Sequence, residues 1–304
     1  MSNKMSENNI RRLVTIKYLY LIGVEQSKQA GTFAGFSILA FHDCVEMLLV
    51  LIAEKKKKKS QQHFLDYWGI IPQLPYKVQM GNLNSIRKNL KHHANFPDKI
   101  DIQRCCEDVG AFLKESTKEF LKKEFDDIAL STLISFEAVR EDVEKAEVFM
   151  KDGLFFESLD YSKKAFMKLL STYESNKGQW RNSILNVGVK VGNEYRKLAK
   201  SNTEGSNWFE LMTKTTNSMR DVIKITALGI DYKRYALFNY ITPNVIEGCD
   251  ATGTIYVSDK KESFESKISV KRDDCQFCIS FVVDCALKLQ EFDFDINNYS
   301  KERI

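Results

Sequence analysis

Proline is scarce in this chain. Only four of the 304 residues are proline, at positions 72, 75, 97 and 243, and none lies between residues 98 and 242. Because proline breaks helices, this long proline-free stretch, rich in Leu, Lys, Glu and Phe, favours one helix after another. The sequence therefore predicts a mainly α-helical protein, with a helical bundle, a further helical region and a small α+β C-terminal tail that contains a β-hairpin.

Long apolar runs are also missing. The longest, Met47–Ala53, is far shorter than the roughly 20 residues that span a bilayer, and residues 1–9 are polar and lack a signal-peptide core. We therefore expect a cytoplasmic protein without a membrane partner. Its seven cysteines are accordingly expected to be reduced thiols.

Several common catalytic signatures are absent. The sequence contains no Walker A loop, no dinucleotide-binding glycine pattern and no Gly-x-Ser-x-Gly segment, so kinase, ATPase, dehydrogenase and hydrolase functions of those types lose their usual support. His42 and Glu46 have the helical spacing of metal ligands, but no HExxH motif accompanies them. We therefore predict neither a cofactor nor a metal at this place.

One group of cysteines could form a zinc site. Cys275 and Cys278 form a single CxxC pair, and Cys249 and Cys285 can complete a set of four thiolates. The alternative is structural, because Cys278, Val282 and Cys285 are also spaced as one buried helical face. A lone close pair favours the structural interpretation.

Charge is distributed unevenly along the chain. Residues 1–125 carry 20 Lys and Arg against 13 Asp and Glu, a net charge of +7, whereas the remaining residues carry 25 against 28, a net charge of −3. A positive N-terminal part suits a phosphate-rich partner such as RNA. The five lysines at 55–59 supply most of this excess, so charge alone decides nothing.

Helical spacing of apolar residues organises the N-terminal part. Helices are predicted at residues 8–28, 32–55, 63–68 and 83–93, followed by one with Ile102, Cys105, Val109 and Phe112 on one face. Together these helices form a compact domain over residues 1–122.

The rest of the chain divides into two predicted parts. A second helical region covers residues 123–242, with Gly153 separating two of its helices. A small α+β tail covers residues 243–304. In this tail, residues 252–258 and 267–271 alternate as strands do, residues 259–266 suit a hairpin loop, and residues 278–289 suit a helix.

The segment at residues 84–97, NSIRKNLKHHANFP, carries the most informative pattern. Arg87 and His92 are separated by four residues, so on a helix they lie about 140° apart and about 7.5 Å along the axis. A long arginine side chain can still bend toward an imidazole near the helix end. Asn89, three residues before His92 and four before His93, lies beside both.

Residues Arg87 to His92, RKNLKH, resemble the Arg-x4-His motif of the HEPN (higher eukaryotes and prokaryotes nucleotide-binding) domain family, although Lys88 stands where this family more often has Asn. The preceding apolar helix contains Asp43 and Glu46, which resemble the acidic spot of these domains. The order of helices over roughly residues 8–122 also fits. The resemblance implies an HEPN-like helical bundle and a homodimer in which two motif helices face each other.

Arginine and histidine together suit RNA cleavage without a metal. RNA is cut when its 2′-OH attacks the adjacent phosphate, so the attacking oxygen must lose a proton and the leaving 5′-oxygen must gain one. Histidine serves either task at neutral pH, and arginine stabilises the charge of the phosphorane. We assign proton transfer to His92 and charge stabilisation to Arg87, while Asn89, Lys91 and His93 position the RNA.

Asp43 and Glu46 are unusual in an otherwise apolar stretch, because buried carboxylates need a partner. The functional interpretation is that one of them pairs with Arg87 or orients a histidine. The alternative is an ordinary salt bridge or a water-facing stripe.

Further basic residues offer RNA contacts. Lys88 follows Arg87 directly, and Lys233, Arg234 and Tyr235 belong to an aromatic and basic segment that can stack on bases and hold phosphates. Such a helix more often buries its rings and solvates its charges.

The leading hypothesis is therefore a metal-independent endoribonuclease, acting as a toxin or antiviral-defence effector of the abortive-infection kind, with RNA as substrate and an inhibitor or antitoxin as a candidate partner. This setting follows from the resemblance. The alternative is a non-catalytic HEPN-like module that binds RNA, a nucleotide or a protein partner in a defence or toxin–antitoxin complex. A third interpretation is a helical scaffold.

Overall fold

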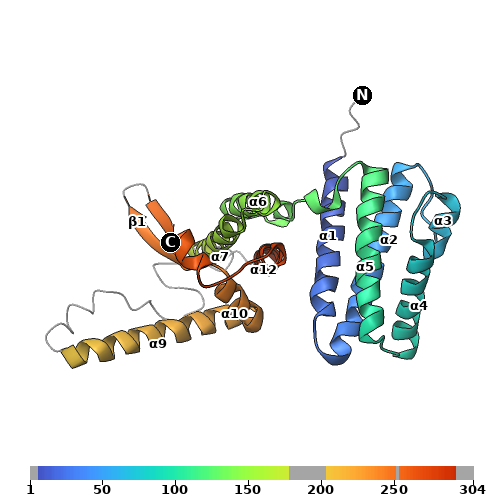
Figure 1. Cartoon of the computed structure of the whole chain (residues 1–304). Helices are drawn as coiled ribbons and strands as arrows, with labels where there is room; N and C mark the ends of the chain where they lie inside the picture. Colours follow the sequence, from blue (N-terminus) through green and yellow to red (C-terminus); the bar gives the residue numbers. More distant parts are fainter. Residues whose placement is uncertain (1–5, 178–202, 251–252, 292–304) are drawn as a thin grey trace, which may run out of the picture. The chain divides into compact units, whose positions relative to one another are not determined.

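The computed structural model describes residues 6–177, 203–250 and 253–291. Over these residues the chain is mostly helical, with a two-stranded antiparallel sheet near the C-terminus (Figure 1). It divides into two compact units, Met1–Leu133 and Ile134–Ile304. The predicted mainly α-helical class and the C-terminal β-hairpin are confirmed.

Long helices that lie side by side form the N-terminal unit (Figure 1). They are α1 (Glu7–Ser27), α2 (Ser37–Lys55), α4 (Lys77–His93) and α5 (Lys99–Ser116). The shorter turns between them are η1 (Gly31–Phe36), η2 (Phe64–Asp66) and α3 (Tyr67–Ile70). Ser6 and Asp98 cap α1 and α5, because their side chains accept hydrogen bonds from backbone N–H groups of the first turn.

α2 is the central helix of this unit. Ile38, Phe41, Leu48 and Ile52 are completely buried, and α2 contacts α1, α4 and α5. By length and composition alone, the helical stretch Gly31–Lys55 is a candidate membrane span within the described residues, which the short apolar run had not suggested. Its most apolar window is 67% buried in the structure, as is usual for a core helix.

α4 is longer than its sequence pattern indicates. It begins at Lys77 rather than near Leu83, and it ends at His93 as predicted. Tyr76 (φ 56°) and Ala94 (φ 53°) flank it in left-handed conformations that interrupt the helical backbone at both ends. The sequence around Pro72 and Pro75 favours an irregular connection, so the part of the helix before Leu83 was missed.

The residues that follow α5 pack back onto the N-terminal unit. They form η3 (Thr117–Leu121), η4 (Phe125–Asp127) and η5 (Ser131–Leu133). Phe125 enters the core, and Nζ of the buried Lys17 donates hydrogen bonds to the backbone carbonyls of Asp126 (2.9 Å) and Ile128 (2.6 Å). The first domain was predicted over residues 1–122, and with these contacts the compact unit extends to Leu133.

The C-terminal unit is also built mainly from helices. They are α6 (Glu137–Lys151), α7 (Phe155–Lys177), α9 (Thr203–Ala227), α10 (Tyr232–Ile241), α11 (Lys261–Glu265) and α12 (Arg272–Glu291). Gly153 separates α6 from α7 with φ 76°, a conformation that glycine adopts without strain. Phe166, Phe238 and Phe281 pack together, with ring centroids 4.7 to 5.4 Å apart, and join α7, α10 and α12 in one core.

The β-hairpin lies earlier in the chain than predicted. β1 (Val245–Asp250) pairs with β2 (Gly253–Ser258) in antiparallel register, with Val245 opposite Ser258. Residues 267–271 are not a strand, and residues 259–266 contain α11 instead of a hairpin loop. The predicted strand at 252–258 is thus confirmed from Gly253 on, with Thr252 outside the described residues, but its partner precedes it in the sequence.

Candidate functional site

α4 divides the predicted site residues between two faces. Met80, Leu83, Asn84 and Leu90 lie on its buried face. Arg87 follows Asn84 at helical spacing and is half-buried at the edge of that face. The other predicted residues of this helix are exposed: Lys88, Asn89, Lys91, His92 and His93.

A polar pocket of about 370 Å³ lies beside Arg87, between α2, the segment at η2 and α4. The residues lining it that can exchange protons, bind ions or form side-chain hydrogen bonds include His42, Glu46, His63, Asn84, Arg87 and Lys88. A second pocket of about 400 Å³, between α1 and residues 122–132, is lined by mainly apolar side chains, lysines and carboxylates and contains no histidine. The pocket beside Arg87 is the better candidate for a functional site, because it holds the imidazole and guanidinium groups that acid–base and anion chemistry use.

His42 forms the floor of this pocket and is only 3% exposed. Its ring stacks on Phe64, with centroids 4.3 Å apart, and its Nε2 lies 3.3 Å from Oδ1 of Asn84. Its Nδ1 makes no hydrogen bond with the described residues, and lies 3.7 Å from Asp43 Oδ1 and 3.8 Å from Glu46 Oε2.

Arg87 also presents an unsatisfied atom. Its Nε is buried without a hydrogen-bond partner, and within the described part of the chain the guanidinium forms no ion pair. A buried polar group without a partner costs about 1–3 kcal/mol, more if charged. Arg87 Nε and His42 Nδ1 therefore belong to one pocket whose polar groups the protein itself leaves incompletely satisfied.

The structure does not bring Arg87 and His92 to one place within a single chain. Arg87 lines the pocket, whereas His92 is exposed on the last turn of α4 and is absent from the pocket lining. The five-residue offset accounts for this, because it turns His92 about 140° away from Arg87. Asn89, Lys91 and His93 lie outside the pocket with His92.

The two carboxylates of α2 approach His42 rather than Arg87. The side chains of Asp43 and Glu46 are 56% and 47% exposed, and their oxygens flank the histidine ring. Neither forms an ion pair with Arg87 in the described residues. Of the two partners considered from the sequence, a histidine is the one that they contact.

From the sequence, His42 was considered only as a metal ligand and set aside, and Asn84 was given no role. A signal for both was present, since each is a polar residue on an apolar helical face. The link between them was not visible, because the contact joins residues 42 positions apart in different helices.

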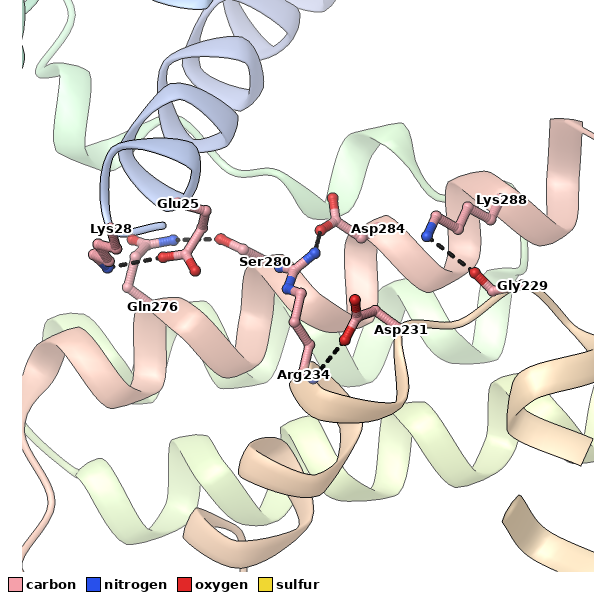
Figure 2. A network of polar contacts seen from close by, with 9 residues as sticks. All are labelled: Glu25, Lys28, Gly229, Asp231, Arg234, Gln276, Ser280, Asp284 and Lys288. Atoms are coloured by element: carbon pink, nitrogen blue, oxygen red, sulfur yellow. Dashed lines mark hydrogen bonds and ion pairs between the residues drawn. The ribbon is translucent and has the colours of Figure 1, made fainter. Parts of the chain in front are cut away.

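The residues proposed for RNA contact on α10 lie in the C-terminal unit. Figure 2 shows that Arg234 bonds through its backbone N–H to Asp231 and through its guanidinium to Asp284 of α12. Tyr235 packs on Phe166 and is half-buried, and its burial raises the pKa of its hydroxyl. Lys233 is exposed. Arg234 and Tyr235 thus have structural contacts, and Lys233 is the basic side chain that faces solvent.

The cysteines of α12 form part of the core. Cys275, Cys278 and Cys285 are at most 2% exposed, and burial raises the pKa of the Cys275 thiol to about 11. These three do not converge as metal ligands within the described residues, and the side chain of Cys249 lies outside them. The geometry supports the structural interpretation of this helical face.

Comparison of the chain with protein-family models, with curated proteins and with solved structures gave no match. The functional interpretation consequently depends on the residues of the site and on their geometry.

Proposed function

We propose that this protein is a metal-independent endoribonuclease with an HEPN-like N-terminal unit. The observation that carries the proposal is Arg87, a half-buried guanidinium that lacks an ion-pair partner in the described residues and borders a polar pocket. A permanent cation left in this state is suited to an anion from outside the chain. Lys88, exposed on the rim, adds a second positive charge.

RNA cleavage assigns complementary roles to Arg87 and His92 of α4. Arg87 stabilises the extra negative charge that develops on the phosphate during attack. His92, exposed and therefore accessible to substrate, takes the proton of the 2′-OH or gives one to the leaving 5′-oxygen. The P–O5′ bond breaks as the P–O2′ bond forms, and the products are a 2′,3′-cyclic phosphate and a 5′-hydroxyl. Asn89, Lys91 and His93 bind the RNA backbone beside His92.

The proposal includes a homodimer. Within one chain His92 does not line the pocket that Arg87 borders, so a site that combines Arg87 with His92 needs the His92 of a second protomer. Two protomers with facing α4 helices meet this need, because the exposed end of each helix then lies over the other. A role as a toxin or antiviral-defence effector with an inhibitor partner rests on the HEPN resemblance.

A cleavage assay with purified full-length protein tests the proposal. Total RNA is incubated in excess EDTA with wild type, Arg87→Ala and His92→Ala, and with Arg11→Ala as a control arginine on the exposed face of α1. We expect cleavage by wild type and the control, loss in the two site variants, and products that end in a 2′,3′-cyclic phosphate. RNA that is bound but never cut, with affinity equal in all four proteins, would contradict the proposal.

The separation of His92 from Arg87 favours a second candidate, a non-catalytic module that binds RNA, a nucleotide or a protein partner through the pocket. In that case Arg87→Ala weakens binding, His92→Ala does not, and no cleavage products form with any variant. The same set of proteins therefore distinguishes the two candidates.

A further inference from the structure

Three potential ligand atoms converge on the α2 wall of the pocket. Nδ1 of His42, a carboxylate oxygen of Asp43 and a carboxylate oxygen of Glu46 all lie within 4.8 Å of one another. The spacing follows from the helix, because residues i and i+4 share a face and residue i+1 borders it. His42 is fixed by burial and stacking, whereas the two carboxylates are about half exposed and free to adjust.

The contact with Asn84 determines what His42 presents to these carboxylates. Oδ1 of Asn84 is an acceptor, so Nε2 of His42 carries the ring proton and donates it to Asn84. In the neutral imidazole Nδ1 then carries a lone pair and faces two carboxylate oxygens, which also present lone pairs. Such an arrangement is repulsive unless a positive charge lies between the three atoms. Metal-binding histidines are commonly held in this way by a hydrogen bond from the other ring nitrogen.

The separations are close to those that a metal ion needs. Bonds of about 2.1 Å to a tetrahedral ion place its ligands about 3.4 Å apart. Nδ1 lies 3.7 and 3.8 Å from the two carboxylate oxygens, so small rotations of the exposed side chains suffice. One imidazole and two carboxylates, without a thiolate, suit Zn²⁺ or Mn²⁺.

We propose that His42, Asp43 and Glu46 bind a divalent transition-metal ion, Zn²⁺ or Mn²⁺, whose remaining coordination positions open into the pocket beside Arg87. The carboxylates supply two negative charges against the positive charges of Arg87 and Lys88 on the pocket wall. An anionic oxygen in the pocket can then contact both the ion and the guanidinium. This proposal concerns α2 and holds whether or not the end of α4 cuts RNA.

Calorimetric titration of the metal-stripped full-length protein tests the site. Mn²⁺ is the first probe because thiolates, which the chain also contains, bind it poorly; Zn²⁺ follows. We expect one site in wild type, and at least about tenfold weaker binding in Asp43→Asn and Glu46→Gln, which keep side-chain size on an exposed surface. Glu115→Gln, an exposed carboxylate of α5, serves as the control and should bind as wild type does.

Asn84→Ala provides an independent check, because loss of a hydrogen bond to a ligating histidine typically weakens metal binding by roughly 10–100-fold. Circular dichroism establishes that each variant is folded. Absence of Mn²⁺ and Zn²⁺ binding in wild type, or equal binding in wild type and Glu46→Gln, would overturn the proposal. RNA cleavage in EDTA is scored separately, so failure of this site leaves the nuclease proposal untouched, and the reverse also holds.

Discussion

Nε2 of His42 lies 3.3 Å from Oδ1 of Asn84, and this contact links the central helix α2 to the motif helix α4. Both side chains are buried, at 3% and 8% exposure. The contact fixes the distance between α2, which carries Asp43 and Glu46, and α4, which carries Arg87. The pocket thus depends on a polar contact inside an otherwise apolar interface.

Asn84→Ala should destabilise the protein by roughly 1–3 kcal/mol, because it leaves a buried imidazole N–H without an acceptor. Asn89→Ala, on the exposed face of the same helix, should change stability by at most about 0.5 kcal/mol. Urea unfolding of the two variants beside wild type measures the difference. Equal stabilities would show that the contact with His42 contributes nothing to folding.

Ala94→Gly should stabilise the protein by up to about 1 kcal/mol. Ala94 ends α4 with φ 53°, a conformation that strains any residue with a Cβ atom. Ala111→Gly, inside α5, is the control of opposite sign, since glycine in a helix destabilises by about 0.5–1 kcal/mol. Thermal unfolding should show a higher Tm for the first variant and a lower Tm for the second. A lower Tm for both would contradict the strain at position 94.

Stability should fall as pH rises above about 9. Burial raises the pKa of the Cys105 thiol from 9.0 to about 12, and burial also raises the pKa values of Cys44 and Tyr20. Between pH 9 and 12 the unfolded chain therefore loses the Cys105 proton while the folded chain keeps it. The stabilisation is complete below pH 9 and is lost as pH rises through this window.

Urea unfolding at pH 7, 9 and 10.5 under reducing conditions measures this effect. Cys105→Ala should show a shallower decline than wild type, although its stability at pH 7 is lower because a buried side chain is truncated. If the free energy of unfolding declined equally with pH in the two proteins, a buried, protonated Cys105 thiol would be contradicted.

The ion pair of Arg234 and Asp284 should contribute to the stability of the C-terminal unit. Arg234→Met or Asp284→Asn leaves the partner's charge partly buried, and we expect a loss of roughly 2 kcal/mol for each. The double variant should lose less than the sum of the two, which a double-mutant cycle detects. Lys233→Ala, the exposed neighbour, should leave unfolding unchanged. If Lys233→Ala and Arg234→Met instead weaken RNA binding equally, α10 is an RNA contact surface.

Periodicity predicted the long helices well, because each must bury one apolar face. Ile102, Cys105, Val109 and Phe112 were assigned to one helical face from spacing alone, and all four are buried in α5. The hairpin was harder. Residues 267–271 alternate as strands do, but alternation alone does not show which segment a strand pairs with. The partner of β2 is β1, which was not predicted because Glu247 and Gly248 interrupt its apolar pattern.

The site was predicted only in part, for a related reason. The motif gave Arg87 and the exposed end of α4, which are local features of one helix. The pocket requires α2, η2 and α4 to meet, and contacts between distant residues leave no periodic signal. His42 was visible in the sequence as a polar residue beside Asp43 in an apolar helix, but its partner Asn84 could be identified only once the helices were placed.

The hydrogen bonds of Lys17 bear on the order in which this protein can fold during synthesis. Lys17 lies in the first helix, yet its carbonyl acceptors belong to Asp126 and Ile128, 109 and 111 residues later. At a translation rate of about 5–20 residues per second, the ammonium group waits roughly 5–20 s for them. During that interval α1 can pack on α2, but the contacts of Lys17 with the residues that follow α5 cannot form. The N-terminal unit should therefore complete its folding late, when its last turns have left the ribosome.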